Sequence, residues 1–132
     1  MRVLADSHAV VWYLQGSDRL SARAAQAFAE CEEADGIVVS IATLVDLWYV
    51  TQTTRKLTEA HLAVVRSALL SSTVFTLQPI DLAVVDATTS IARDLLADPW
   101  DRFIVGTASA LALPLVTRDE AIHDAQIVPV IW

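Results

Sequence analysis

Short apolar runs rich in β-branched residues alternate with longer helical patterns along the whole chain. Connections of this kind between strands of one sheet are right-handed crossovers, so the strands run parallel and helices cover both faces of the sheet. We therefore expect an α/β fold, a three-layer α/β/α sandwich around a central, mostly parallel sheet of about four or five strands. The expected strands are residues 2–5, 36–40, 73–78, 113–117 and 127–132, and the expected helices are residues 7–15, 21–34, 43–53, 58–70, 81–96 and 98–111.

Length and hydropathy indicate a single domain without a membrane segment. The 132 residues suffice for one core, and we treat residues 1–132 as one domain. The longest apolar stretch, Ile37 to Val50, spans only fourteen residues and contains Ser40, Thr43 and Asp46. It is too short and too polar to cross a bilayer.

The first residues and the cysteine content bear on the location of the protein. Asp6 and His8 interrupt the apolar N-terminal region, which argues against a secretory signal peptide. The single cysteine, Cys31, excludes an internal disulfide and favours a reducing compartment. We therefore expect a cytoplasmic protein that does not interact with a membrane.

The charge balance is acidic. Sixteen Asp and Glu residues against nine Lys and Arg residues give a net charge of −7. Taken alone, this charge argues against nucleic acid as the partner and favours a basic partner or bound cations.

Acidic residues lie close to the ends of the expected strands. Asp6 directly follows the first strand, Asp119 follows the fourth, Asp101 lies at the start of a helix, and Asp46 lies about a turn and a half into the helix after the second strand. The carboxyl ends of parallel strands share one sheet edge, so these side chains are expected near that edge. Gathered carboxylates repel one another unless a cation is bound, and oxygen-only ligands favour Mg²⁺ or Mn²⁺, which activate water for displacement at a phosphoryl group. Because some of sixteen acids follow strands by chance, spacing alone leaves a metal site and a chance arrangement open.

The segment Asp98-Pro99-Trp100-Asp101 has two interpretations. Asp98 has the side chain of an N-cap, Pro99 suits the first helical position, and Asp101 falls at the third, where an acid completes a capping box. Alternatively, the two carboxylates are half of a metal site.

Four segments resemble, in order and spacing, the four acidic blocks of the PIN domain. They are VLADSHAVVWYL, VSIATLVDLWYV, DPWDRFIVGTASAL and LVTRDEAI, and the likeness extends to GSDRLSARA and to the terminal VPVIW. Among PIN domains the chain is most similar to the VapC-type ribonuclease toxins of bacterial toxin–antitoxin pairs. This resemblance spans nearly the whole chain.

The resemblance implies a role for each matching residue. It implies that Asp6, Asp101 and Asp119 bind metal, and that Asp46 stands where the family usually has glutamate. It further implies that Asp98 is the extra aspartate of one branch of the family, a cap that orients its neighbours, and that Ser7 and Thr117 are hydroxyls supporting the site.

The function implied by the resemblance is that of an endoribonuclease toxin that uses Mg²⁺, or Mn²⁺, to activate water for RNA cleavage. A homodimer neutralised by a cognate antitoxin is implied as well. The departure at Asp46 shortens the side chain by one C–C bond, about 1.5 Å, and Mg²⁺ geometry is strict. A catalytically impaired PIN domain that mainly binds a partner therefore stays open as an alternative.

A third function, phosphoryl transfer to an aspartate, is disfavoured. It requires an adjacent acidic pair or a DxD motif after the first strand and usually a lysine near a later strand end. The first strand is followed by one acid, Asp6, and the only lysine is Lys56.

The basic residues near these acids have open roles. Arg102 and Arg118 adjoin Asp101 and Asp119, where they either bind RNA phosphates or form salt bridges to the acids. Arg55 and Lys56 follow the helix of Asp46 and are candidates for an RNA-facing rim.

The histidines and tryptophans favour structural interpretations. His8 either contacts a substrate phosphate or is partly buried, whereas His61 and His123 lack metal-ligand spacing and are expected at the surface. Core or interface packing is favoured over base stacking for Trp12, Trp48, Trp100 and Trp132.

Overall fold

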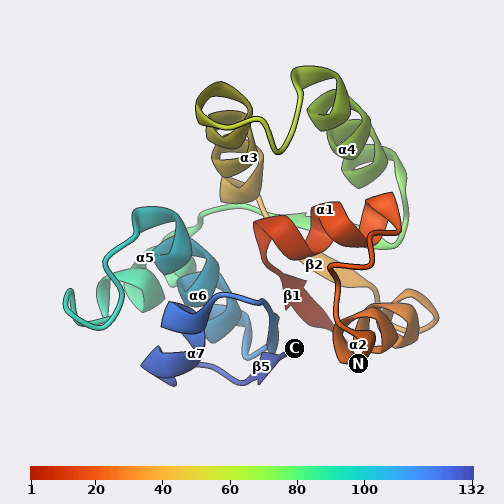
Figure 1. Cartoon of the computed structure of the whole chain (residues 1–132). Coiled ribbons are helices and arrows are strands. Elements are labelled where there is room, and N and C mark those ends of the chain that lie inside the picture. Colours follow the sequence, from red (N-terminus) through yellow and green to blue (C-terminus); the bar gives the residue numbers. More distant parts are fainter.

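A computed structural model describes all residues of the chain, 1–132. Five strands and seven helices follow one another in the expected alternation (Figure 1). The strands are β1 (Val3–Ala5), β2 (Ile37–Ser40), β3 (Phe75–Gln78), β4 (Leu115–Val116) and β5 (Val130–Ile131). The helices are α1 (Ser7–Gln15), α2 (Ala22–Glu32), α3 (Ala42–Thr53), α4 (Glu59–Ser71), α5 (Leu82–Thr89), α6 (Pro99–Leu111) and α7 (Glu120–Ala125).

The strands form one sheet in the order β3-β2-β1-β4-β5, and every neighbouring pair is parallel. This confirms the expected parallel sheet. The order reverses at β1: the chain first adds strands on one side of β1 and then returns to add β4 and β5 on the other. In open parallel sheets, such a reversal opens a crevice at the carboxyl ends of the strands, between β1 and β4 here.

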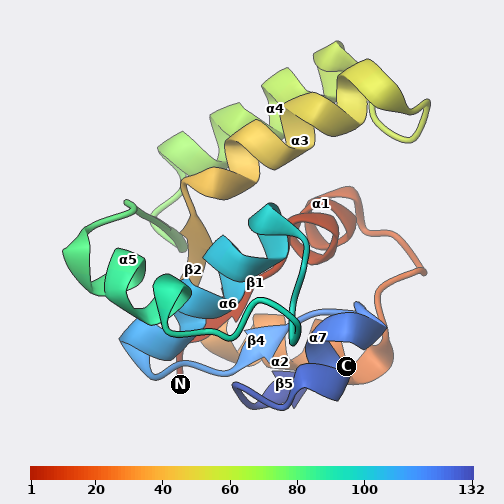
Figure 2. The ribbon, with the colours of Figure 1, turned by 90° about the vertical axis from the view of Figure 1, so that its left-hand side faces the viewer.

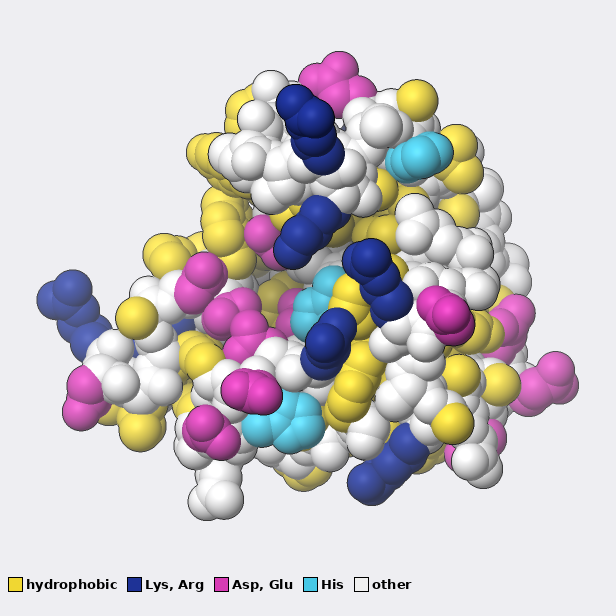
Figure 3. Space-filling model, viewed as in Figure 1, with side chains coloured by type: hydrophobic (Ala, Val, Ile, Leu, Met, Phe, Trp, Pro, Cys, Tyr) yellow, Lys and Arg dark blue, Asp and Glu magenta, His cyan; other side chains and the backbone are white.

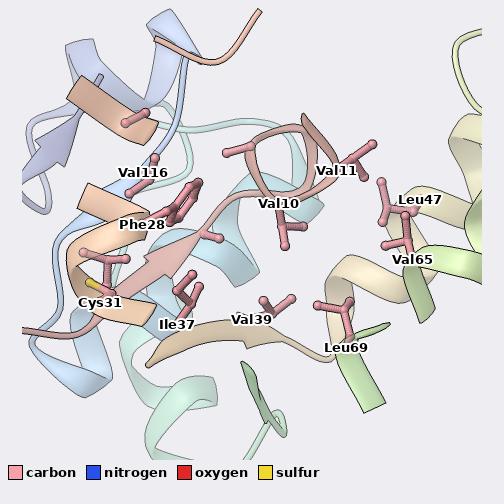
Figure 4. Close-up of a cluster of buried hydrophobic side chains, with 14 of the residues drawn as sticks. Val10, Val11, Phe28, Cys31, Ile37, Val39, Leu47, Val65, Leu69 and Val116 are labelled. Atoms are coloured by element: carbon pink, nitrogen blue, oxygen red, sulfur yellow. The ribbon is translucent and has the colours of Figure 1, made fainter. Parts of the chain in front are cut away.

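Alternate residues of the central strands face two separate hydrophobic cores. Val3, Ala5, Ile37 and Val39 pack with side chains of α1, α2, α3 and α4 (Figure 4). Leu4, on the opposite face of the sheet, packs in a second core that includes buried side chains of α6. Because strand side chains alternate between faces, helices must cover both. The three-layer α/β/α sandwich is thereby confirmed.

Helices α3 and α4 form a hairpin that projects from the body of the protein (Figure 2). Helix α3 begins just after β2 ends, so it extends away from the carboxyl edge of the sheet. None of the helices has the length and apolar character that a membrane crossing requires.

Helix boundaries follow capping side chains, as the sequence predicts. The Ser21 and Thr58 side chains accept hydrogen bonds from the backbone N–H groups of Ala24 and His61. Gly16 ends α1 with φ of 63°, a left-handed conformation that glycine adopts at low cost.

Two helical segments differ from the predictions. Helix α5 ends at Thr89, whereas the pattern predicted a helix as far as residue 96. The hydroxyls of Thr89 and Ser90 donate to carbonyls of the preceding turn, and the chain then leaves the helix to pass around the side chain of Arg102. Helix α7 was not predicted, because its six residues are too few to show a helical period.

Helices α5 and α6 pack unusually closely at Gly106. A Cβ atom at this position would lie 2.0 Å from Thr88 Oγ1. The glycine therefore permits the approach that fixes α6, the helix that carries Asp101, against its neighbour.

Candidate functional site

A pocket of about 580 Å³ lies at the carboxyl edge of the sheet and is lined by all four predicted acids. Asp6 follows β1, Asp119 precedes α7, Asp101 lies in the first turn of α6, and Asp46 extends from α3. The expected convergence of these side chains is confirmed. It takes place at the reversal of strand order, where such folds place ligands.

Asp6 is held rigidly at the base of the pocket. Its side chain accepts a hydrogen bond from the backbone N–H of Ser7 at 2.7 Å and one from the hydroxyl of Thr117 at 2.6 Å. Only 4% of Asp6 is exposed. The Ser7 hydroxyl donates in turn to Thr43 Oγ1 at 3.3 Å, so the hydroxyls expected to support the site do surround it.

Thr117 joins two of the acids. Besides donating to Asp6, its hydroxyl accepts the backbone N–H of Asp119 at 3.0 Å. The Asp119 side chain caps α7 by accepting the N–H of Ile122 at 3.1 Å. One buried hydroxyl therefore sets the spacing between the acid after β1 and the acid after β4.

Asp98 and Asp101 have different surroundings. Asp98 Oδ1 accepts the N–H groups of Trp100 at 2.8 Å and Asp101 at 3.2 Å. Asp98 is exposed and does not line the pocket, whereas Asp101 does. The capping interpretation of Asp98 is confirmed, and Asp101 is the member of the pair that faces the other acids.

The charge of the pocket shifts the pKa of two carboxyl groups upward. Burial, with the nearby carboxylates of Asp119, Asp98, Asp6 and Asp46, raises the pKa of Asp101 to about 7. Burial also raises the pKa of Asp46, and the Asp6 and Asp98 carboxylates add to this rise, whereas the nearby Ser7 hydroxyl and His8 oppose it. Burial comes first in both shifts, and the neighbouring carboxylates add to it, because both disfavour the ionised form of a carboxyl group.

The donor set fits a hard divalent cation in its chemistry. Every pocket acid is an aspartate and the adjoining groups are hydroxyls, which are oxygen ligands that Mg²⁺ and Mn²⁺ prefer. No three His, Cys, Asp or Glu side chains are close enough together to form a ready ligand set.

Arg118 lies at the rim of the pocket with His8 and Trp12. The backbone N–H of Arg118 donates to His8 Nε2 at 3.0 Å, and the guanidinium lies 5.8 Å from the Trp12 ring centroid. His8 Nδ1 is 3.7 Å from Asp6 Oδ2. His8 is thus partly buried between Asp6 and the loop after β4, in agreement with its structural interpretation.

Arg102 has neither of the two roles that the sequence allowed. Its guanidinium donates to the carbonyls of Thr88, Ile91, Ala92 and Leu96, and it does not line the pocket. The reason is helical geometry, because neighbouring residues on a helix point about 100° apart. Arg102 therefore holds the α5–α6 connection, on the side of α6 away from the acids.

The remaining pocket residues include Arg19, which the sequence did not single out, and Trp12, for which the sequence favoured core or interface packing. Lys56 lines the pocket as the rim prediction required, but Arg55 does not. Arg19 and Trp12 also line it. Arg19 lies in the loop after α1, where no local pattern indicates which way a side chain points. Trp12 is one turn beyond His8 on α1, and that spacing was the available signal.

The sequence matches the family model of the PIN domain over residues 3–128. The chain belongs to the PIN-domain family. Among curated proteins, none matches it.

Solved structures share the fold at low sequence identity. VapBC2 from Rickettsia felis, bound to a DNA fragment from its promoter, has a TM-score of 0.73 at 13% identity, covering 98% of this chain and 97% of that one. DNA-bound VapBC from Salmonella typhimurium has a TM-score of 0.72 at 18% identity, with 98% and 96% covered. VapBC-5 from Mycobacterium tuberculosis, a member of the VapBC family of toxin–antitoxin systems, has a TM-score of 0.63 at 16% identity, with 98% and 96% covered.

Proposed function

We propose that this PIN domain is a divalent-metal-dependent endoribonuclease and the toxin of a toxin–antitoxin pair, similar to VapC. The observation that carries the proposal is the convergence of Asp6, Asp46, Asp101 and Asp119 in one pocket. Support for the biological setting comes from the similar folds of VapBC complexes.

In this proposal Asp6, Asp101 and Asp119 hold Mg²⁺, or Mn²⁺, and Asp46 reaches it directly or through water. The cation supplies positive charge against the phosphodiester and lowers the pKa of water. The chain contributes the placement of the ligands: Thr117 fixes Asp6 relative to Asp119, and the cap at Asp98 fixes the start of the helix that carries Asp101. Such preorganisation keeps the acids aligned with the cleaved bond.

The proposed partner surface is the outer side of the α3–α4 hairpin. Val45 and Trp48 are 45% and 47% exposed and, with Leu44, Leu62 and Arg66, they line a groove of about 310 Å³. Exposed apolar area of this kind suits an apolar helix of a cognate antitoxin. Because α3 also carries Asp46, a partner bound there lies next to the pocket. A homodimer and a cytoplasmic location complete the proposal, the latter supported by the single, buried Cys31.

The alternative function, an impaired PIN domain that mainly binds a partner, is favoured by one observation. Asp46 is one C–C bond shorter than the glutamate that the resemblance to the family implies at this position.

RNA cleavage by the purified protein separates the two functions. The proposal predicts fragments of a structured RNA that appear with Mg²⁺ or Mn²⁺, vanish with EDTA, and are absent for Asp6→Asn at unchanged folding. If intact RNA persists with either ion while the protein still binds its antitoxin, the partner-binding alternative is correct.

A further inference from the structure

Three cationic side chains line the acidic pocket from three different loops. Arg19 follows α1, Lys56 connects α3 and α4, and Arg118 follows β4. Figure 3 shows Lys and Arg side chains around the hollow in which acidic and histidine side chains lie. A protein of net charge −7 has concentrated positive charge beside its most acidic site.

These cations are not neutralised by the acids near them. The ion pairs in the structure are those of the N-terminus with Asp35 and of His8 with Asp6, and neither includes Arg19, Lys56 or Arg118. Unpaired cations spread over three loops match the spaced phosphates of an extended strand better than a single carboxylate.

Trp12 adds an aromatic ring to this rim. It is half-buried and packs against His8 and Trp132, with ring centroids 5.0 and 5.9 Å away. His8, Trp12, Arg118 and Asp119 line a hollow of about 280 Å³, and all of them also line the acidic pocket. The hollow is therefore an open, shallow side chamber of the acidic pocket, where the Trp12 ring and the Arg118 guanidinium lie beside Asp119, a proposed metal ligand.

A ring in this position serves a purpose beyond packing. Unpaired bases of single-stranded RNA stack on aromatic side chains and guanidinium planes, whereas a duplex keeps its bases covered. Trp48, which is 47% exposed, lines the groove of the α3–α4 hairpin and not the acidic pocket.

We propose that, in the RNA strand of the proposed reaction, the phosphates lie along Arg19 and Lys56 and the base next to the cleaved bond stacks in the Trp12–Arg118 chamber. This proposal rests on the ribonuclease function and names how the strand is held. The chamber would make the cleavage position depend on an unpaired base rather than on the backbone alone.

Binding of a fluorescent single-stranded RNA oligonucleotide to the Asp101→Asn protein tests the proposal without cleavage. Trp12→Leu is expected to weaken binding about tenfold, and Trp12→Phe, which keeps an aromatic face, to weaken it less than about threefold. The slope of log affinity against log salt should be the same for both variants as for the parent, because no phosphate contact is lost. Leu82→Ala, a change of an exposed apolar residue on α5 outside the pocket, is the control and should bind as the parent does.

Charge variants give the complementary result. Arg19→Gln and Lys56→Gln should each reduce the slope of log affinity against log salt by about 0.7, the value for one phosphate of a single strand. Arg93→Gln, an exposed arginine on the α5–α6 connection, should leave the slope unchanged.

Oligonucleotides that each lack one base test stacking without altering the protein. One abasic position should weaken binding to the Trp12 protein about tenfold and leave binding to Trp12→Leu unchanged. Equal losses for Trp12→Leu and Leu82→Ala, equal losses for Trp12→Leu and Trp12→Phe, or the absence of a Trp12-dependent abasic position would overturn the proposal. Cleavage is measured separately on the wild type, so failure of the ribonuclease function is distinguishable from failure of this binding mode.

Discussion

The hydroxyl of Thr117 lies 2.6 Å from Oδ2 of Asp6 and joins the ends of β1 and β4, two strands whose residues are more than a hundred positions apart in the sequence. The same oxygen accepts the backbone N–H of Asp119. The spacing of two proposed metal ligands thus depends on one fully buried side chain.

Thr117→Val should damage both stability and cleavage. Valine keeps the shape but leaves a buried carboxylate oxygen and a backbone N–H without partners, a loss of about 1–3 kcal/mol. Urea unfolding and RNA cleavage rates measure the two effects, and Thr117→Ser, which keeps the hydroxyl, is the control. A valine variant as active as the serine variant would show that the hydroxyl does not position the acids.

Asp101→Asn should stabilise the metal-free protein near neutral pH. The raised pKa of about 7 means that the folded state binds a proton more readily than the unfolded state, so ionisation of Asp101 opposes folding. The free energy of unfolding should therefore decrease as the pH rises from about 4 to about 7 in EDTA, and less so in the variant. The expected gain above pH 7 is about 1–2 kcal/mol, below the ~4 kcal/mol of a fully buried group, because solvent screens the pocket.

Asp98→Asn is the matched control for that measurement. Asparagine caps a helix as well as aspartate does, and position 98 is exposed. Melting of Asp98→Asn in EDTA should follow the wild type more closely than that of Asp101→Asn. If both variants gave the same pH profile, the division between a cap and a pocket acid would be wrong.

Asp46→Glu should tighten Mg²⁺ binding and raise the cleavage rate. The longer side chain adds about 1.5 Å of reach from α3 toward the other pocket acids. We expect several-fold tighter binding in a calorimetric titration, whereas Asp86→Glu, an exposed change on α5, should have no effect. Weaker binding by Asp46→Glu would mean that the pocket is built for the shorter acid.

Arg102→Met should destabilise the fold by about 2–3 kcal/mol, because several carbonyls of the α5–α6 connection lose a charged donor at once. Arg102→Lys should not restore the loss, since an ammonium lacks the planar fork that spans those acceptors. Urea unfolding measures the change, with Arg93→Met as the control on the same connection. An unfolding free energy equal to that of the control would show that the connection holds without Arg102.

The local features of this fold could be predicted from the sequence. Helix starts at Ser21, Thr58 and Asp98 depend on a side chain and the N–H groups within three residues of it, so they follow from spacing. The acids after β1 and β4 were predictable for a related reason: in a parallel sheet the carboxyl end of every strand lies at the same edge.

Tertiary contacts account for what the sequence could not show. The direction of Arg102 is set by carbonyls of a connection that leaves its helix earlier than the apolar pattern indicated. The position of Arg19 at the pocket depends on how the loop after α1 folds back. Neither contact can be predicted from a periodic pattern of residues in the sequence.

Cleavage rates in a Mg²⁺ titration, compared between the wild type and Asp119→Asn, show whether the pocket acids form a metal-dependent nuclease site. Asparagine preserves the cap of α7 and removes only the negative charge, so the fold should be retained. The wild-type rate should saturate with Mg²⁺, and the variant rate should be lower by at least about a hundredfold at every Mg²⁺ concentration. Equal, Mg²⁺-dependent rates for the two proteins would contradict the claim that these acids form the nuclease site.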